Sequence, residues 1–251
     1  MQRYFVSPDQ MTDSTVTIRG DDVKHIAKVM RMTTGDEVIC SNNHDRVAKC
    51  EIIDFDDSRV ELSVIEWLDR HTELPIPVTI AQGLPKSDKL EMIVQKGTEL
   101  GANVFLPFQA SRSIVKWDAK KSKKKTERLQ KIIKEAAEQS HRNRMPVCEE
   151  PITFNELISQ SNTYTIKVVA YEEDAKQSES AKLAELFQQI DPNKDRLLVV
   201  VGPEGGLTPE EVDELKKAGF VTCGLGPRIL RTETAPLYVL AAVSYQLELL
   251  R

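Results

Sequence analysis

The sequence predicts an α/β protein in which a small β-rich domain precedes a larger domain of alternating strands and helices. Residues 1–70 hold short candidate strands separated by turn residues. From residue 78 onward, strand-like runs alternate with segments of helical periodicity. Two of these runs, 164–173 and 196–202, are continuously apolar, as strands buried on both faces of a parallel sheet are. A length of 251 residues accommodates two such domains.

The first domain is expected to span residues 1–70. One segment, DDVKHIAKVMRM (21–32), has the apolar spacing of a helix. Small β-barrels with one inserted helix are common RNA-reading modules, although the same pattern fits many unrelated barrels. Residues 71–77, which contain Pro75 and Pro77, read as a linker. The candidate strands of this domain are RYFV, STVTIRG, DEVICSN, RVAKCEII and RVELSVIEW.

The second domain is expected to span residues 78–251. Ser87 is expected to cap a helix that follows the first strand, and residues 127–140 form a clear amphipathic helix. The last segment, 234–251, is helical and apolar over a wider surface than one core stripe requires, which suggests a second packing partner such as another subunit. The expected strands are VTIAQGL (78–84), NVFLPFQA (103–110), YTIKVVAYEE (164–173) and RLLVVVG (196–202).

The composition of the chain argues against several classes of protein. No apolar run approaches the ~20 residues that span a bilayer, and the N-terminus lacks the features of a signal peptide. The four cysteines occur singly and the four histidines are scattered, so neither a disulfide framework nor a metal-ligand spacing is present. We therefore expect a metal-free cytoplasmic protein with reduced thiols.

Charge is distributed unevenly along the chain. The formal net charge is −5, yet residues 112–144 hold twelve Lys/Arg against four Asp/Glu, a local charge of +8. A basic block in an acidic protein points to a polyanionic partner held at one place. For the run KKSKKK (120–125) alone, a solvated helix face or a mobile loop is an equally open interpretation.

Two glycine-rich segments near the C-terminus are the most informative. In VVVGPEGGLTPEEV (199–212) an apolar run meets a glycine turn, and Thr208 to Glu211 read as a capping box with proline at the first helical position. Because glycine has no Cβ atom, a flat ligand can lie directly against the backbone of such a turn. The second segment, GLGPRILRTETAP (224–236), places a turn before Thr234, a plausible N-cap of the last helix. The first segment has neither the spacing of a dinucleotide site nor that of a P-loop phosphate site.

Together these segments resemble the RsmE family of 16S rRNA (uracil-N3)-methyltransferases, which belong to the SPOUT class of knotted α/β methyltransferases. Four further segments resemble that family, so the likeness covers nearly the whole chain. The lysine run 120–125 is not part of the family pattern. The further segments are MQRYFV at the start, HIAKVMRM (25–32), KSDKLEMIVQKGTELG (86–101) and EAAEQSHRNRMP (135–146).

The resemblance implies a C-terminal SPOUT-type α/β domain with a deep trefoil knot, behind an N-terminal PUA-like β-barrel. It implies S-adenosylmethionine as cofactor, bent into the knot, and a homodimer in which the knot faces its partner. The residues that the resemblance places around the cofactor are Gly202, Glu204, Gly205, Gly206, Leu225, Gly226, Ile229, Leu230, Arg231, Thr232, Thr234 and Ala235.

The implied acceptor is a uracil N3, which becomes nucleophilic only when its proton leaves. Arg231 is a candidate to stabilise the resulting anion or the base carbonyls, and Glu138 and Arg142 are further catalytic candidates whose alternative role is surface ion pairing. The target uridine must be unpaired or flipped. Substrate 16S rRNA or the small ribosomal subunit would contact the basic stretch 112–144 and the barrel. The candidate RNA-binding residues are Arg3, Tyr4, His25, Lys28, Arg31, Arg112 and Arg144.

Three other interpretations remain open from the sequence. A different knotted RNA methyltransferase would share the cofactor site and differ in its acceptor pocket. A non-catalytic RNA-binding assembly factor would keep the fold without turnover, although such a protein does not need Gly202, Gly205, Gly206 and Arg231 together. A nucleotide-binding protein is disfavoured because the phosphate-loop lysine is missing.

Overall fold

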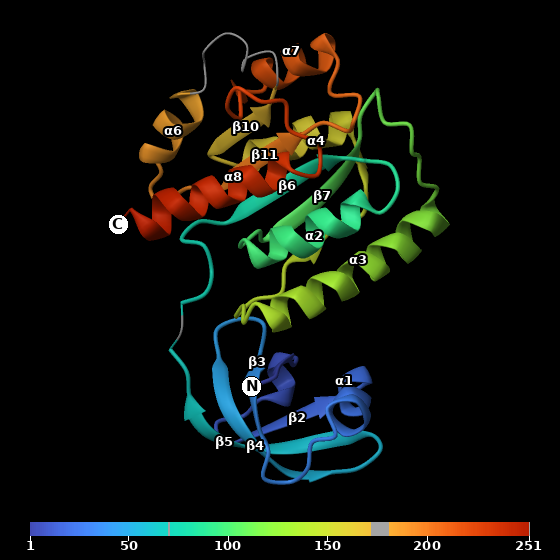
Figure 1. The fold of residues 1–251 in the computed structure, drawn as a ribbon, viewed down its shortest axis with the longest axis vertical. Coiled ribbons are helices and arrows are strands. Elements are labelled where there is room, and N and C mark those ends of the chain that lie inside the picture. Colours follow the sequence, from blue (N-terminus) through green and yellow to red (C-terminus); the bar gives the residue numbers. More distant parts are fainter. Residues whose placement is uncertain (70, 172–180, 251) are drawn as a thin grey trace. The chain divides into compact units, whose positions relative to one another are not determined.

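The computed structural model describes residues 1–69, 71–171 and 181–250 (Figure 1). The chain divides into two compact units. The first comprises Met1–Glu73 together with Ala137–Met145, and the second comprises Leu74–Ala136 together with Pro146–Arg251. The first unit thus includes a segment that lies more than sixty residues further along the chain.

The first unit is built on one curled five-stranded sheet of order β1-β3-β4-β5-β2. β1 and β3 pair in parallel, and the other neighbours are antiparallel. Two register shifts, between Lys49 and Cys50 and between Ile52 and Asp54, interrupt the β4–β5 ladder and increase its bend. The strands are β1 (Arg3–Phe5), β2 (Thr15–Arg19), β3 (Glu37–Ser41), β4 (Val47–Phe55) and β5 (Arg59–Trp67).

The predicted helix at 21–32 is present as α1 (Asp21–Lys24) and its π-helical continuation His25–Val29. It buries Val23 and Ile26 against the sheet. Alternation along β2, β4 and β5 turns every second side chain into the same core. That core consists of Tyr4, Val6, Met11, Val16, Ile18, Val23, Ile26, Val38, Cys40, Ala48, Cys50, Ile52, Val60 and Leu62.

Segment Ala137–Met145 is joined to the first unit by buried polar contacts. The Arg3 guanidinium donates to the backbone carbonyl of Arg142 and, at 3.0 Å, to Oδ1 of Asn143. Arg142 is itself buried and forms an ion pair with Glu73. The Ser41 hydroxyl donates to the carbonyl oxygen of Asn143 at 2.6 Å. Because buried charges persist only when they are paired, these contacts fix the segment to the sheet.

The second unit contains a seven-stranded sheet in which every pairing is parallel. Its order is β12-β10-β11-β6-β7-β8, and β9 also pairs with β7. All five residues of β11 are buried, as the continuous apolar run predicts for a central parallel strand. The strands are β6 (Val78–Gly83), β7 (Val104–Gln109), β8 (Val147–Cys148), β9 (Ile152–Thr153), β10 (Ile166–Ala170), β11 (Leu197–Val201) and β12 (Val221–Cys223).

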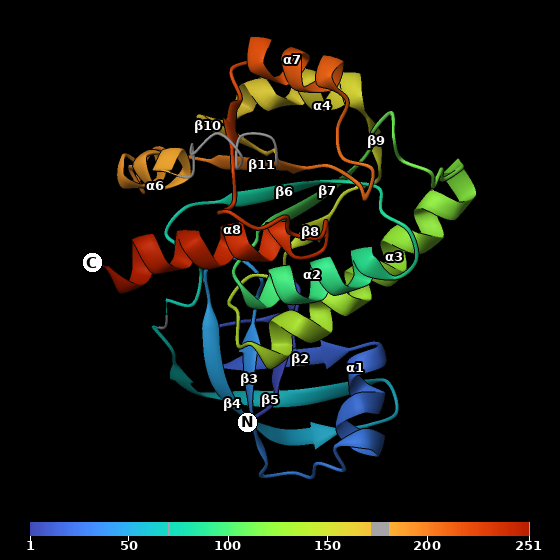
Figure 2. The same cartoon turned by 45° about the horizontal axis from the view of Figure 1, so that its top comes forward.

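Helices cover both faces of this sheet. Figure 2 shows α4 (Phe154–Gln160) and α7 (Pro209–Lys217) on one face and α2 (Lys89–Glu99) and α8 (Ala235–Ser244) on the other. The predicted capping box of α7 is confirmed, since Thr208 Oγ1 accepts from Glu211 N and Glu211 Oε2 accepts from Thr208 N. The remaining helical segments are α3 (Ala119–Gln139), α6 (Ala181–Gln188), the π-helical end Tyr245–Leu249, and short 3-10 turns at Pro8–Gln10 and Ser161–Thr163.

Two predicted helix starts are wrong. α2 has Asp88, not Ser87, as its N-cap, because Ser87 adopts φ +54° in a turn where the Lys86 N–H is bound by the Glu204 carboxylate. α3 begins at Ala119 rather than 127, so the lysine run is helical. Lysine and alanine favour helix, and Asp118 Oδ1 accepts from Lys121 N at 2.8 Å in the first turn. Residues 172–173 of the predicted strand 164–173, and Arg251 of the last helix, lie outside the described residues.

Candidate active site

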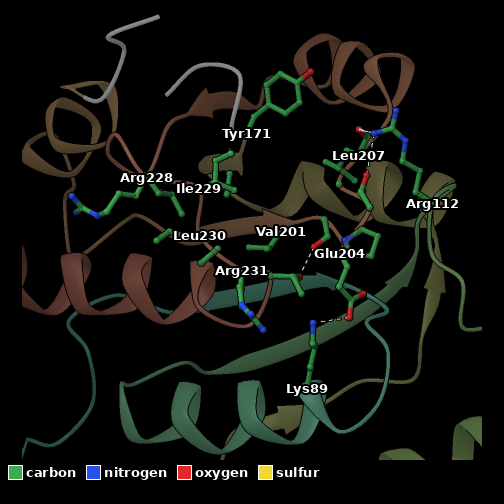
Figure 3. A pocket seen from close by; sticks show the side chains of 18 of the residues that line it. Lys89, Arg112, Tyr171, Val201, Glu204, Leu207, Arg228, Ile229, Leu230 and Arg231 are labelled. Atoms are coloured by element: carbon green, nitrogen blue, oxygen red, sulfur yellow. Dashed lines mark hydrogen bonds and ion pairs between the residues drawn. The ribbon is translucent and has the colours of Figure 1, made fainter. Parts of the chain in front are cut away.

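A cavity of about 550 Å³ opens in the second unit where two loops meet at the carboxyl end of the parallel sheet (Figure 3). The first loop, 202–208, follows β11, and the second, 224–234, joins β12 to α8. Both the volume and the place are typical of a small-molecule site in an α/β fold. The cavity is lined by Lys89, Arg112, Ala170, Tyr171, Val201, Gly202, Pro203, Glu204, Gly205, Gly206, Leu207, Pro209, Leu225, Pro227, Arg228, Ile229, Leu230, Arg231, Thr232 and Ala235.

The first loop is a tight turn that requires glycine. A Cβ on Gly202 would lie 3.0 Å from the backbone of Gly206 and Leu207, and Gly206 has φ +67°. From outside the turn, Arg112 Nη1 donates to the carbonyl oxygens of Gly205 at 3.0 Å and Leu207 at 3.2 Å. The loop is thereby held in one shape before any ligand arrives, which lowers the entropic cost of binding.

The second loop is tied to the first at the base of the cavity. Thr232 Oγ1 donates to the carbonyl oxygen of Gly202 at 2.6 Å. Gln82, fully buried at the end of β6, donates from Nε2 to Thr232 Oγ1 at 2.9 Å and to Gly202 O at 3.2 Å. One strand side chain therefore bonds to both loops. Buried bonds of this kind are costly to break because they leave unsatisfied polar groups.

A charged network lies on the α2 side of the cavity. Lys89 Nζ is 2.9 Å from Glu204 Oε1 and 3.3 Å from Glu233 Oε2, and Figure 3 shows Lys89 and Glu204 pointing toward one another. The hydrogen bond to Glu204, followed by that to Glu233, raises the pKa of Lys89 despite some desolvation. Partial burial opposes ionisation of Glu204, but the bonds from Lys89 and the Lys86 backbone lower the pKa of that carboxyl on balance. Both groups are charged at neutral pH.

Arg231 extends from the second loop at the cavity wall. Its side chain is 82% exposed, and its Nη1 lies 3.9 Å from Oε1 of Glu233, whose own side chain is only 12% exposed. Glu233 thus lies between Lys89 and Arg231 and forms a long ion pair with the arginine guanidinium, most of which remains accessible. The lining includes four cationic side chains, Lys89, Arg112, Arg228 and Arg231, against one carboxylate, Glu204. Glu204 and Glu233 balance the charge of Lys89, so the arginines supply the excess positive charge, which favours an acceptor that develops negative charge.

The structure brings most of the predicted cofactor residues together. Gly226 and Thr234 are not part of the lining: Gly226 lies in the second loop with φ +84°, and Thr234 is the N-cap of α8. The predicted residues that do line the cavity are Gly202, Glu204, Gly205, Gly206, Leu225, Ile229, Leu230, Arg231, Thr232 and Ala235.

The catalytic candidates divide between the units. Arg231 lines the cavity of the second unit. Glu138 and Arg142 belong to segment Ala137–Met145 of the first unit, where Arg142 is buried and paired with Glu73. The catalytic role of Glu138 and Arg142 stays a prediction.

The RNA-binding candidates occupy different environments. Arg3 and Tyr4 are buried in the first unit, and burial, with the nearby charges of Asp22 and Glu138, raises the pKa of Tyr4. Tyr4 Oη lies 3.1 Å from His25 Nδ1. Lys28 and Arg31 are on or just after the π-helical turn that follows α1, and Arg31 has φ +53°. Arg144 is exposed and donates to the His44 carbonyl, whereas Arg112 lies on the cavity wall. A role in RNA contact stays a prediction for all of them.

Sequence reasoning missed Gln82 and Lys89. A signal existed for Gln82, because it is a polar residue in the otherwise apolar strand VTIAQGL and buried polar groups need partners. Lys89 offered no such signal, since an exposed lysine at the start of an amphipathic helix is ordinary. Only the approach of α2 to both loops shows that Lys89 contacts Glu204 and Glu233.

Within the described residues, no three His, Cys, Asp or Glu side chains gather in a way that could hold a metal ion. All four cysteines, Cys40, Cys50, Cys148 and Cys223, are buried and none forms a disulfide. None of the helices in the described ranges is long and apolar enough to cross a membrane.

Comparison with known proteins gives consistent matches over the chain. Residues 72–244 match the family model of an RNA methyltransferase domain, and residues 18–65 match that of an RNA methyltransferase PUA domain. The chain is 53% identical over 254 residues to ribosomal RNA small subunit methyltransferase E of Bacillus subtilis, covering 100% of this chain and 99% of that protein.

Two solved structures of similar size also align. A ribosomal RNA small subunit methyltransferase E from Neisseria gonorrhoeae, bound to S-adenosyl methionine, superposes with a TM-score of 0.84 at 27% identity, covering 97% of each chain. A methyltransferase from Legionella pneumophila, in complex with the cofactor SAM, gives a TM-score of 0.83 at 26% identity, covering 96% of each chain.

Proposed function

The chain belongs to the family of ribosomal RNA small subunit methyltransferase E, and we propose that it methylates N3 of one uridine in 16S rRNA. The protein is an S-adenosylmethionine-dependent RNA methyltransferase with a PUA-type domain, as the resemblance implied. The single observation that carries the proposal is the cavity formed by the two glycine loops, because it unites the cofactor residues with a cationic wall.

The residues present fit S-adenosylmethionine, which supplies an electrophilic methyl group on a sulfonium sulfur. Gly202, Gly205 and Gly206 expose backbone on one side of the cavity, and Leu225, Ile229 and Leu230 provide an apolar wall on the other. Aromatic and aliphatic parts of a ligand bury well against such a wall. We assign the adenine to the apolar wall and the ribose and methionine part to the glycine loop.

The chain's own residues explain how N3 becomes nucleophilic. Arg231 reaches the cavity with a largely exposed guanidinium that can donate to a uracil carbonyl. When the N3 proton passes to solvent water, negative charge spreads onto the two carbonyl oxygens, and the cation beside them stabilises the anion. Glu233 and Lys89 are assigned as positioning residues, because Glu233 pairs with the Arg231 guanidinium and Lys89 pairs with both Glu233 and Glu204.

We propose a homodimer, which the exposed surface of the last helix supports. Tyr238, Tyr245 and Leu249 follow one another at helical spacing on α8 and its continuation, and their exposed fractions are 43%, 56% and 70%. Apolar side chains so aligned form a stripe that a second copy would cover. We assign this stripe to the dimer interface and place the enzyme in the cytoplasm, with domain bounds of 1–70, a linker at 71–77, and 78–251.

The test is mass spectrometry of nucleosides from small-subunit rRNA of cells with and without the gene. We expect 3-methyluridine to disappear in the deletion strain and to return when its rRNA is treated with purified protein and S-adenosylmethionine. Unchanged 3-methyluridine together with loss of another methylated nucleoside would overturn the uracil assignment and leave the methyltransferase assignment standing. Arg231→Gln serves as the matched variant, expected to bind cofactor and to lose turnover.

A further inference from the structure

The lysine run 120–125 has no place in the function proposed so far. The structure puts it in the first turns of α3, where Lys120, Lys121, Lys123 and Lys124 are exposed. Figures 1 and 2 both show this end of α3 extending past the start of α2. A rigid helix holds charges at fixed spacing, whereas a loop would not.

Four of the basic side chains of α3 lie on one face and form a strip along the helix. At 100° per residue, Lys120, Lys123, Lys124 and Lys131 project within the same third of the helix circumference. The opposite face carries Ser122, Leu129 and Ile133, all buried. We call Lys120, Lys123, Lys124 and Lys131 the lysine strip. It runs for about 16 Å along the helix, and Glu127 is the one acidic residue within it.

The charges of the lysine strip are not neutralised by the protein. Within the described parts of the chain, none of its four lysines forms an ion pair. Their neighbours differ: Arg128 pairs with Glu91 of α2 at 2.8 Å, and Lys125 lies over the Trp117 ring at 4.9 Å. Arg128 and Lys125 therefore serve packing, while the strip presents net positive charge to solvent.

We propose that the lysine strip binds successive phosphates of the substrate RNA. The inference rests on the proposed function, because the same unit carries the cavity and its substrate is RNA. Each nucleotide of an RNA strand carries one phosphate charge, at a density comparable to the one per ~3.4 Å along each strand of a DNA duplex, so a strip about 16 Å long faces several of them. Outside residues 112–144 the chain carries a net −13, so RNA is repelled elsewhere and held here.

The experiment compares the salt dependence of RNA binding in three full-length proteins. The test variant is Lys120→Gln/Lys124→Gln, which removes two charges from the strip and keeps good helix formers. The matched control is Lys216→Gln/Lys217→Gln, the same charge change at exposed positions of α7 in the same unit. The probe is in vitro-transcribed 16S rRNA, titrated over a range of salt concentrations.

We expect the strip variant to lower the magnitude of the log K against log salt slope by about 1.4 to 1.8, that is 0.7 to 0.9 per lost phosphate contact. The control should keep the wild-type slope, and both variants should keep wild-type S-adenosylmethionine affinity. Equal slopes for all three proteins would overturn the proposal and point to an acidic protein partner for the strip.

Methyl transfer by the wild type is measured in parallel and decides the proposed function separately. If the wild type is active and the three proteins have equal salt slopes, only the proposal that the lysine strip binds RNA is refuted. Inactive wild type refutes the proposed function, while the slopes still decide whether the strip binds RNA.

Discussion

The Thr232 hydroxyl donates a 2.6 Å hydrogen bond to the carbonyl oxygen of Gly202, thirty residues earlier in the chain. Gln82 Nε2 donates to both atoms from the end of β6. The two glycine loops are thus fastened to each other and to the central sheet. Their separation, and with it the width of the cofactor cavity, depends on three polar groups that are all buried.

Thr232→Val removes the hydroxyl from this junction. It removes two buried hydrogen bonds, one donated to the Gly202 carbonyl and one accepted from Gln82, so we expect a loss of about 1–3 kcal/mol in stability and weaker binding of S-adenosylmethionine by isothermal titration calorimetry. The control is Thr79→Val on the same strand as Gln82, which breaks the bond donated by Tyr164 to Thr79 Oγ1. It should cost comparable stability and leave cofactor affinity unchanged. Equal cofactor affinity in both variants would contradict the role of the junction.

Gly226→Ala tests the second loop. Gly226 has φ +84°, a conformation that costs a side chain about 1–2 kcal/mol, although the new Cβ would meet only the Tyr238 hydroxyl at 3.9 Å. We expect the loop to shift and cofactor affinity to fall. Gly35→Ala, with φ +94° and open space in the first unit, imposes the same strain away from the cavity. The melting temperature should fall in both variants, whereas the affinity for S-adenosylmethionine should fall only in Gly226→Ala.

Lys89→Met removes the cation that holds Glu204 and Glu233. Displacing the Glu204 loop, and Glu233 with the Arg231 guanidinium that it contacts, misaligns the reacting groups, so we expect kcat to fall on the order of a hundredfold. Lys96→Met breaks only the exposed pair with Glu99 on the same helix, and should retain turnover. Single-turnover methylation of 16S rRNA distinguishes the two; wild-type turnover in Lys89→Met would show that the network is dispensable.

The Glu204 carboxyl has a lowered pKa in the folded protein, although desolvation works against this. Its ionised form therefore stabilises the fold above the unfolded pKa of about 4.3, and this contribution is lost as pH falls through the lower folded value. At pH 7, wild type should have a higher melting temperature than Glu204→Gln. This difference in melting temperature should disappear in strongly acidic buffer. Glu214→Gln, at an exposed position of α7, is the control. If the difference in melting temperature between wild type and Glu204→Gln widens on acidification, the ionised form of Glu204 does not stabilise the fold.

Leu249→Glu places a charge in the exposed stripe on α8 and its continuation. A carboxylate in a buried apolar interface is costly, so sedimentation velocity should show a shift from dimer to monomer. Ile53→Glu, at a side chain 48% exposed in β4, makes the same kind of change on the first unit. It should leave the oligomeric state unaltered. A dimeric Leu249→Glu protein would place the interface elsewhere.

Features that depend on near neighbours could be predicted from the sequence. The Thr208–Glu211 capping box, the apolar runs of β10 and β11, and the helix after residue 20 all appear where the local pattern indicates them. The short strands β8, β9 and β12 had no such pattern, because two or three residues are too few for a periodicity. They form through pairing with longer strands.

The sequence by itself determined the two glycine loops, the α/β order of the second domain and the family, since these are encoded in contiguous residues. Only the tertiary structure decided how Gln82 reaches Gly202 and Thr232, 120 and 150 residues away, and how Lys89 joins Glu204 to Glu233. It also decided that segment Ala137–Met145 belongs with the first unit. The physical reason is the same in each case: a buried polar group takes whichever partner folding brings within about 3 Å, and sequence spacing does not record that distance.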